Sequence, residues 1–251
     1  MDSKQRVVRV IIVLCLIFIW YILTLNQTER EMLFFPSPTA VWNTLINQFN
    51  EIISFSFTTW YRVSLGLLIG GLLGFVFGLL MSSSNIINLI FDPIIEIIRP
   101  IPPVALTPFF ILWFGLGNLS QLLLISMGCF MIICISTYEA IRNVNPIYIR
   151  AARSLGVKGV AIYKTIIVPA IMPALLPNIR VALASAFALA VAAEYLGAQG
   201  GLGYLIRNAR TILQTETILL AALLLGIESM ITDWGIRLIF DYINRWMPNN
   251  K

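Results

Sequence analysis

The side chains that could do chemistry are few and scattered in this chain of 251 residues, which contains no histidine. Without histidine there is no histidine-based acid–base catalysis, no Ser-His-Asp triad and no imidazole metal ligand. Cys15, Cys129 and Cys134 lie in apolar runs, so we expect small buried hydrophobic residues and neither a disulfide nor a metal cluster. No GxxxxGK[ST] loop for nucleotide phosphates occurs. The sequence therefore predicts no catalytic centre, no metal site and no cofactor bound by this chain.

Two groups of charged residues lie within apolar stretches. Glu194 is near the end of one such stretch, where an ionisable side chain marks a candidate functional site. A place on a solute path is one interpretation of Glu194; a structural hydrogen bond or a position at the membrane surface is the other. Asp233 and Arg237 are four residues apart, so they are expected to pair on one helix face in a structural role.

The most basic segment covers about residues 138–169. Asn145 followed by Pro146 is typical of a helix start. Ile147, Ala151 and Leu155 then repeat every four residues, with Arg150 and Arg153 off that stripe. The run Gly156-Val157-Lys158-Gly159 ends this helix, and a second short helix over about 160–168 is expected to stop at Pro169. The segment is thus predicted to form a small exposed helix–turn–helix.

Three interpretations of this helix–turn–helix compete. A DNA-binding unit is disfavoured because membrane spans closely bracket the segment, and a plain solvated basic loop is common in membrane proteins. A docking element for a soluble partner fits best. Small residues at Ala151 and Ala152 would permit close contact, and the glycine turn would give a compact protrusion.

The elements that must position these residues are helices in a bilayer. Hydrophobic residues make up 59% of the chain and charged residues 12%, against about a quarter charged in an average soluble domain. We therefore predict an all-α polytopic membrane protein with one transmembrane domain over 1–251 and about six transmembrane helices. The expected spans are 7–25, 60–81, 86–114, 119–137, 177–194 and 217–240.

The second span carries a stripe of glycines four residues apart, at Gly66, Gly70, Gly74 and Gly78. This spacing places them on one helix face and lets another helix approach closely. We favour packing within one subunit, with a subunit interface as the alternative.

The third span is interrupted by Arg99-Pro100-Ile101-Pro102-Pro103 and by Pro108, which cannot continue a regular helix. Irregular backbone at membrane depth is tolerated where protein or a water-filled cavity covers it. Pro100, Pro102 and Pro103 are therefore candidates for a solute path. A kink that only shapes packing is the equal alternative.

Residues 37–53 show an amphipathic helical pattern that starts at Ser37-Pro38. A helix lying in the membrane interface is one interpretation, and a helix packed on its own protein is the other.

The distribution of the 17 Lys and Arg residues predicts the topology. With both termini cytoplasmic, eleven lie inside and four outside, while Arg99 and Arg180 stay unassigned. The inside residues are Lys4, Arg6, Arg9, Arg142, Arg150, Arg153, Lys158, Lys164, Arg237, Arg245 and Lys251; the outside residues are Arg30, Arg62, Arg207 and Arg210.

The basic segment resembles the "EAA" loop of permease subunits of binding-protein-dependent ABC importers. The family pattern is Glu-Ala-Ala, three residues, Gly, nine residues, Ile, one residue, Leu-Pro. Here the matching residues are Arg150, Ala151, Ala152, Gly156, Ile166, Val168 and Pro169. The spacing matches fully. Arg150 replaces the family's Glu, so no acidic role is carried over to that position.

The resemblance extends over nearly the whole chain and is closest to the nitrate/sulfonate/taurine branch. It rests on Ser37-Pro38-Thr39-Ala40-Val41-Trp42, on Arg99-Pro100-Ile101-Pro102-Pro103-Val104-Ala105, on Trp113 to Gly117, on Ala192-Ala193-Glu194 and on Gly201-Leu202-Gly203. It implies a permease, not an enzyme, in the inner membrane of a prokaryote. The implied partners are a second permease subunit, a cytoplasmic ATPase dimer that holds ATP and Mg, and an external binding protein, with no nucleic acid. Nitrate, a sulfonate, taurine, bicarbonate and a small heterocycle are all open as solutes.

Two other classes of function compete with an ABC permease. A secondary transporter driven by sodium or protons differs in its energy source, since it would need no ATPase chain. A membrane-embedded enzyme would need an acidic metal cluster or a nucleophile with a base, and the scattered acids do not provide one.

Overall fold

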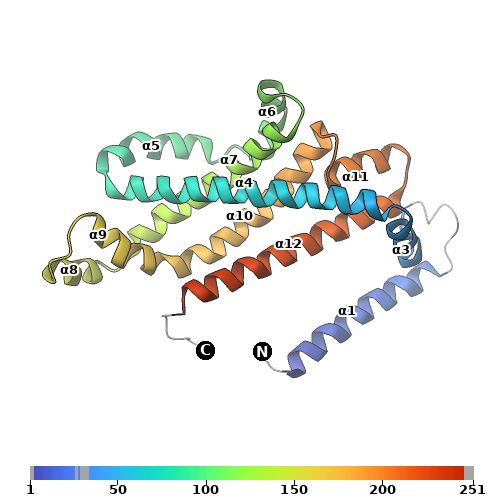
Figure 1. Cartoon of the computed structure of the whole chain (residues 1–251), viewed down its shortest axis with the longest axis horizontal. Helices are drawn as coiled ribbons and strands as arrows, with labels where there is room; N and C mark the ends of the chain where they lie inside the picture. Colours follow the sequence, from blue (N-terminus) through green and yellow to red (C-terminus); the bar gives the residue numbers. More distant parts are fainter. Residues whose placement is uncertain (1–2, 26–27, 29–33, 246–251) are drawn as a thin grey trace.

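The computed structural model describes residues 3–25, 28 and 34–245, and this part of the chain is helical with no strand. The all-α prediction is confirmed (Figure 1). The helices are α1 (Ser3–Thr24), α3 (Pro38–Asn47), α4 (Phe49–Ser83), α5 (Asn85–Ile98), η1 (Pro103–Leu106), α6 (Thr107–Phe114), α7 (Asn118–Arg142), α8 (Pro146–Ser154), α9 (Val160–Ile162), η2 (Tyr163–Ile167), α10 (Val168–Gly197), α11 (Leu202–Thr211) and α12 (Thr215–Ile243).

Four long apolar helices match the length and composition of membrane spans. They are α4, α7, the continuous helix Val160–Gly197 and α12. A fifth candidate is the pair Asn85–Ile98 and Pro103–Phe114, which is bent by 85° at the proline-rich break. The prediction of an interrupted third span is therefore confirmed as a bend. The first predicted span corresponds to α1, whose apolar part is Ile11–Thr24.

The centre of the bundle is the contact of α4 with α7 and α10. Its core is formed by residues such as Ile125, Leu183 and Ala186, which have almost no exposed surface. The glycine stripe of α4 lies in this contact. A Cβ atom on Gly70 would lie 2.1 Å from the Ser126 carbonyl oxygen, and one on Gly74 would lie 2.6 Å from that of Phe130. The stripe thus packs against α7 of the same chain, which is the favoured interpretation.

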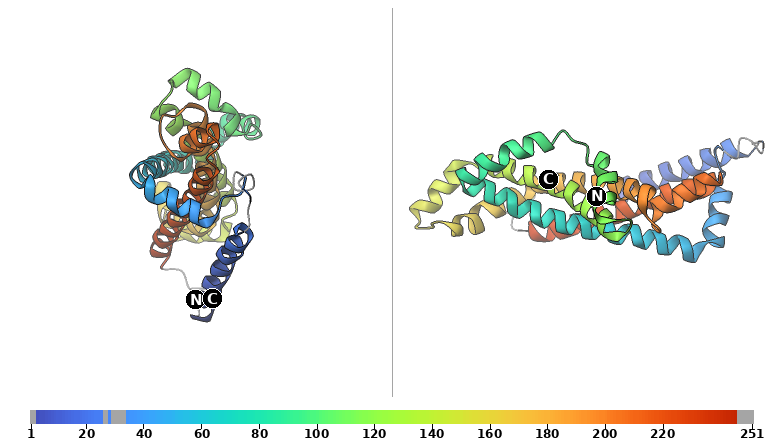
Figure 2. Two further views of the ribbon diagram at one scale, coloured as in Figure 1. Left: turned by 90° about the vertical axis from the view of Figure 1, so that its right-hand side faces the viewer. Right: turned by 90° about the horizontal axis from the view of Figure 1, so that it is seen from above.

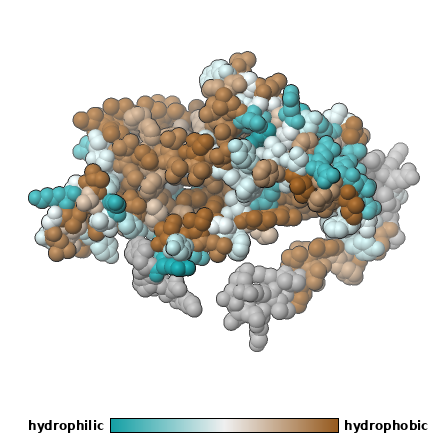
Figure 3. Space-filling model, in the orientation of Figure 1, coloured by the Kyte–Doolittle hydropathy of each residue, from teal (hydrophilic) through white to brown (hydrophobic). Residues whose placement is uncertain are grey.

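Many large hydrophobic side chains on the outside of the bundle are exposed. Figure 3 shows hydrophobic residues dominating the face turned to the viewer. Helix α1 is largely exposed: among its described side chains only those of Trp20 and Thr24 are not, and its contacts include α3 and the segment before it. Cys15 on α1 is consequently exposed, whereas Cys129 and Cys134 are buried. The expectation of burial is wrong for Cys15, because little of this chain covers α1.

The amphipathic stretch 37–53 is not one helix. Helix α3 starts after Ser37, whose side chain accepts a hydrogen bond from the Ala40 N–H at 3.2 Å, and it ends at Asn47. Gln48 is a non-helical break, and residues from Phe49 onward begin α4. The second long helix therefore starts well before residue 60. The side chain of Val41 packs in a core with Ile52 and Leu205, which favours packing on its own protein over a position on the membrane surface.

Prolines do not end the helix that follows the basic segment. The prediction of a stop at Pro169 and of a span that starts after Pro177 is wrong, since α9, η2 and α10 run on as one helix over Val160–Gly197. Tyr163–Ile167 is a π-helical turn in which the Val168 N–H donates to the Tyr163 carbonyl. Such a turn loosens the pattern of backbone hydrogen bonds in the helix just before Pro169, which has no N–H to contribute. Pro173 and Pro177 lie further inside the helix.

The two ends of the bundle carry different elements. Helices α8 and α9 protrude at one end, whereas α3 and α11 lie at the opposite end, which the views in Figures 1 and 2 agree on. Helix α11 follows the short loop that contains Gly200 and Gly201. It packs on α10 and α12 and contributes Leu202 and Leu205 to the core near Val41.

Candidate functional site

The first candidate site is the protrusion formed by α8 and the turn that follows it. The side-chain oxygen of Asn145 accepts a hydrogen bond from the Ile147 N–H at 3.0 Å, and Pro146 occupies the first turn. This arrangement satisfies a free N–H group at the helix start. The predicted start of the helix is confirmed.

The turn after α8 is a Schellman motif. The Val157 N–H donates to the Ala152 carbonyl at 3.0 Å, and the Gly156 N–H donates to the Arg153 carbonyl at 3.0 Å. Gly156 has φ of +87°, a left-handed conformation that favours glycine. The spacing Ala-x-x-x-Gly therefore has a physical basis, because the two residues are the C3 and C′ positions of the same helix end.

The two faces of α8 differ. Ala152 is buried, and Ile149 packs against the core formed by Ile162, Ile167 and Ile171. Ala151 is exposed, and so are the side chains of Ile147 (57%) and Leu155 (84%). Ala152 is thus not available to a partner as the sequence suggested, because it packs inwards.

Basic side chains surround this exposed apolar face. Arg150, Arg153 and Lys158 are exposed and form no ion pair in the part of the chain that the structure describes. The remaining residues of the family pattern, Ile166 and Pro169, lie on the continuous helix behind α8 and are partly buried.

The second candidate site is the break between α5 and η1. Pro100 and Pro102 are exposed, while Pro103 lines a cleft of about 330 Å³. Helices α7 and α10 form the other walls of this cleft with residues such as Gly128, Asn178 and Ser185. The break thus lies beside a cavity, as expected of irregular backbone at membrane depth.

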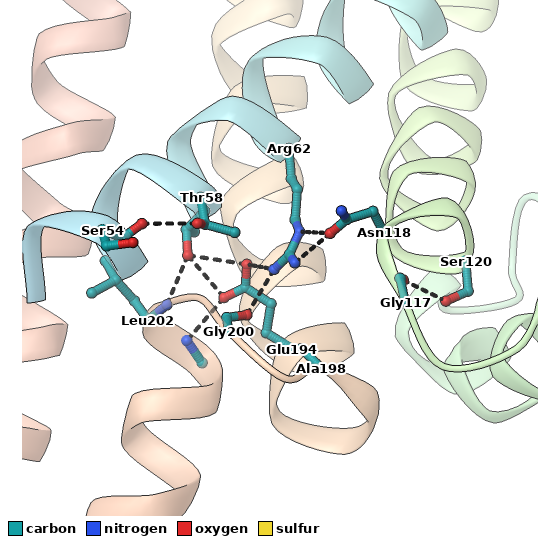
Figure 4. A network of polar contacts seen from close by, with 12 residues as sticks. Ser54, Thr58, Arg62, Gly117, Asn118, Ser120, Glu194, Ala198, Gly200 and Leu202 are labelled. Carbon is teal, nitrogen blue, oxygen red and sulfur yellow. Dashed lines mark hydrogen bonds and ion pairs between the residues drawn. The ribbon is translucent and has the colours of Figure 1, made fainter. Parts of the chain in front are cut away.

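Glu194 lies near the opposite end of the bundle, in a buried network of polar contacts (Figure 4). Its carboxylate has no exposed surface and accepts hydrogen bonds from the Arg62 guanidinium at 2.8 Å and from the Gly203 N–H at 2.9 Å. The Thr59 hydroxyl lies 2.9 Å from the same carboxylate and accepts from the Leu202 N–H at 2.8 Å. The network therefore joins α4 to the end of α10 and to the start of α11.

Arg62 extends this network in two more directions. Its guanidinium donates to the Gly200 carbonyl at 2.8 Å and to the Asn118 side-chain oxygen at 3.0 Å. Every nitrogen of the guanidinium, like the carboxylate, has a hydrogen-bond partner and almost no solvent contact, which favours the structural alternative for Glu194. The charge count assigned Arg62 to the outside, and the structure places it within α4 with a buried side chain.

The predicted pair of Asp233 and Arg237 is confirmed. One Asp233 oxygen accepts from the Arg237 side chain at 2.8 Å. The other accepts from Arg180 on α10 at 2.5 Å, so Asp233 also ties α12 to α10. No group of three acidic or cysteine residues in the described ranges could hold a metal ion.

A helical bundle with four to five apolar spans, a bent pair of helices beside a cleft and an exposed helix–turn at one end defines a multi-spanning membrane protein. Residues 66–247 match the family described as "Binding-protein-dependent transport system inner membrane component". The chain belongs to this family and is a permease subunit of the ABC importer class, not an enzyme.

Relatives and solved structures agree with this membership. A Methanocaldococcus jannaschii protein named as an ABC transporter permease is 32% identical over the whole chain and 96% of the relative. A Bacillus subtilis protein named for aliphatic sulfonate transport is 36% identical over 74% of this chain and 67% of its own length. The taurine transport permease of Escherichia coli is 29% identical over 97% of this chain and 91% of its own length.

The fold is similar to a chain of the MetNI methionine ABC transporter in an inward-facing conformation. The TM-score is 0.68 at 18% identity, over 78% of this chain and 98% of that chain.

Sequence reasoning missed Thr59, Arg62 and Asn118 as members of the Glu194 network. A signal was available for Arg62, which lies in an apolar helix where a cation needs a buried partner. No comparable signal exists for Thr59 or Asn118, since both residue types are common at helix ends and in turns.

Proposed function

We propose that two copies of this chain form the solute path of an ABC importer, driven by a cytoplasmic ATPase dimer and supplied by an external binding protein. The observation that carries this proposal is α8, a capped helix that presents an exposed apolar and basic face at one end of the bundle. An element of this kind can transmit a partner's motion to the spans. The chain itself binds neither ATP nor Mg.

The connection of α8 to the spans supports the role as a coupling element. The buried face of α8 packs on the core at the start of the long helix Val160–Gly197. The Schellman turn fixes the direction in which the chain leaves α8. A displacement of α8 by an ATPase would therefore be passed to α10 through packed side chains, and the favoured state of the bundle would shift with the state of the ATPase.

The proposed solute is a small organic anion of the sulfonate or taurine kind. The support comes from relatives named for aliphatic sulfonate and taurine transport. We place the path beside the break at Pro100, Pro102 and Pro103. We assign Glu194 to holding the outer end of the bundle, because its network leaves it no exposed surface.

The proposed location is the inner membrane of a prokaryote, with both termini and α8 in the cytoplasm. The basic residues Arg150, Arg153 and Lys158 near α8 support this orientation, because cytoplasmic segments carry an excess of Lys and Arg. Lys4, Arg6, Arg9, Arg30 and Lys251, which entered the sequence argument, lie outside the residues whose side chains are described.

The test compares two substitutions at Gly156 in the complex purified with its ATPase from mild detergent. Gly156→Asp and Gly156→Asn both tolerate a left-handed backbone, but only Asp adds a charge at the docking face. We expect Gly156→Asp to lower ATP-driven uptake at least tenfold, with normal membrane insertion, and Gly156→Asn to retain most of it.

Wild-type uptake by Gly156→Asp with its ATPase still bound would contradict the docking role of α8. A wild-type complex that contains no ATPase, shows no vanadate-sensitive ATP hydrolysis and transports on an ion gradient alone would overturn the proposed function as a whole.

A further inference from the structure

A polar stripe on α5 faces a continuous furrow in the bundle. Asn85, Asn88, Asp92, Glu96 and Arg99 follow one another at intervals of three or four residues, which places them on one face of the helix. Other residues of α5 are strongly exposed apolar side chains such as Ile86 (72%) and Leu89 (78%). A polar face inside an apolar stretch at membrane depth indicates contact with protein or water instead of lipid.

Three adjoining clefts form this furrow. The first, of about 490 Å³, lies next to Ile149 and Tyr163 at the α8 end of the bundle. The second, of about 210 Å³, shares Asp92 and Arg142 with the first. The third is the cleft of about 330 Å³ beside Pro103, and it shares Arg99 and Glu139 with the second. The furrow thus runs from the α8 end to the break in α5.

Arg99 lies at the boundary between the second and third clefts and lines both of them. It ends α5 at the bend, and it is the only cationic residue that lines the third cleft. Its guanidinium has no ion pair and no side-chain hydrogen bond within the described part of the chain, although Glu139 lines the same cleft. A guanidinium at membrane depth without a protein partner is costly, so an entering anion gains from pairing with it.

The surroundings of Arg99 match the shape of a small organic anion. Ser136, Asn178 and Ser185 offer neutral hydrogen-bonding groups in the third cleft, and most of its remaining lining is apolar, as at Met127 and Ile132. A guanidinium presents five N–H donors in a planar fork that fits the oxygens of a sulfonate or carboxylate. Towards the α8 end, the second cleft is lined by Asp92 and Glu96 as well as by Arg142, and the two acidic residues would weaken anion binding at that cation.

We infer that Arg99 is a binding residue for the anionic group of the solute within the membrane, so that this chain selects for charge in addition to any selection by a binding protein. The inference rests on the proposed function. The Glu139 carboxylate near Arg99 keeps the site weak enough for release, which conduction requires. The site would lie at the break, before the solute passes along α5 and reaches the clefts that Arg142 lines.

The test uses the permease purified with its ATPase and binding protein in proteoliposomes, with ethanesulfonate as the probe. Arg99→Gln is expected to lower ATP-driven uptake at least tenfold, and Arg99→Lys to lower it about two- to fivefold, because the charge stays but the fork is lost. ATP hydrolysis by these complexes should remain within about twofold of wild type. Arg245→Gln, at the exposed end of α12, is the matched control and should transport normally.

A chemical rescue distinguishes loss of the positive charge at position 99 from a folding defect. Arg99→Cys in a Cys15→Ser background should regain uptake after reaction with a cationic aminoethyl methanethiosulfonate, and not after reaction with the anionic sulfonatoethyl reagent. Cys129 and Cys134 are buried and can stay.

Uptake by Arg99→Gln within twofold of wild type, or equal effects of the two reagents on Arg99→Cys, would overturn the role of Arg99. Parallel losses of uptake and of ATP hydrolysis in the Arg99 variants would also overturn it, because they indicate a structural role. Absence of ATP-driven ethanesulfonate uptake by the unsubstituted complex would instead count against the proposed solute class, and the inference would fail with it.

Discussion

The ion pair of Arg62 and Glu194 is the most completely satisfied polar group in the described part of the molecule. The two side chains have 7% and 0% of their surface exposed, and the carboxylate also accepts from the Thr59 hydroxyl and the Gly203 N–H. Buried pairs of this kind hold a defined geometry, and the removal of one partner leaves an uncompensated charge. The network therefore fixes the loop around Gly200 against α4.

Removal of the cation should destabilise the protein strongly. We expect Arg62→Met to lower the free energy of unfolding by about 3–5 kcal/mol, because Glu194 loses its counter-ion while it stays buried. The measurement is unfolding of the purified protein in detergent, followed by helical circular dichroism. Arg245→Met is the control, since Arg245 is exposed and lies over the Tyr242 ring, so this variant should lose about 0.5–1 kcal/mol. Equal losses in the two variants would contradict the structural role of the network.

A milder change separates charge from hydrogen bonding. Glu194→Gln keeps one acceptor oxygen but brings an NH₂ group towards the donors of Arg62 and Gly203. We expect a loss of about 1–3 kcal/mol in the same unfolding assay, smaller than for Arg62→Met. A loss as large as that of Arg62→Met would show that charge compensation governs the site, because Arg62 would then stay buried without a counter-ion even though one acceptor oxygen remains.

At the scale of elements, the contact of α4 with α7 depends on the absence of side chains along one face. A Cβ at position 70 would lie 2.1 Å from a carbonyl oxygen and 2.9 Å from the Cβ of Cys129, so the two helices would have to separate. The sequence pattern of four glycines predicted close packing but could not identify the partner helix, because the same stripe suits a subunit interface.

Two matched substitutions test this packing. Gly70→Ala should destabilise the protein by about 1–3 kcal/mol through overpacking, even though alanine favours helix. Gly226→Ala in α12 has nothing within 4 Å of the new Cβ, so it should be neutral or stabilising by up to about 1 kcal/mol. Thermal unfolding in detergent measures both. Unchanged stability of Gly70→Ala would mean that α4 and α7 are less closely packed than the structure shows.

Much of the element order could be predicted from the sequence, while several boundaries could not. Long apolar runs predicted the helices, and the prolines after Arg99 predicted the bend, because proline removes N–H donors at fixed positions. Pro169 and Pro177 were misleading for the same reason, since a π-helical turn and the neighbouring helices tolerate them in α10. Local sequence patterns do not show that a π-helical turn or a neighbouring helix makes a proline tolerable inside a helix.

The sites were predictable to different degrees. The cap at Asn145 and the glycine at position 156 are local signals, so α8 and its turn were correctly placed. The network around Glu194 joins residues more than 130 positions apart, such as Arg62 and Glu194, and no local pattern contains that pairing. The burial of Ala152 was missed because which side of α8 faces the bundle is decided by the packing of Ile149 and its neighbours.

At the scale of the whole molecule, the proposed orientation can be tested by the accessibility of its two ends. Arg153→Cys lies on α8 and Asn208→Cys lies on α11, both at exposed positions. In a Cys15→Ser background, a membrane-impermeant maleimide should label Asn208→Cys in spheroplasts and label Arg153→Cys only after the membrane is permeabilised. Labelling of Arg153→Cys from outside would place α8 on the wrong side for an ATPase partner.

The most direct test of the central claim is site-specific photo-crosslinking from the exposed tip of α8 in the assembled complex. A photoreactive amino acid at Leu155, whose side chain is 84% exposed, should yield an adduct with the ATPase chain. The same amino acid at Leu213, 66% exposed between α11 and α12 at the opposite end, should yield none. An ATPase that co-purifies but crosslinks to position 213 and not to 155 would contradict the account.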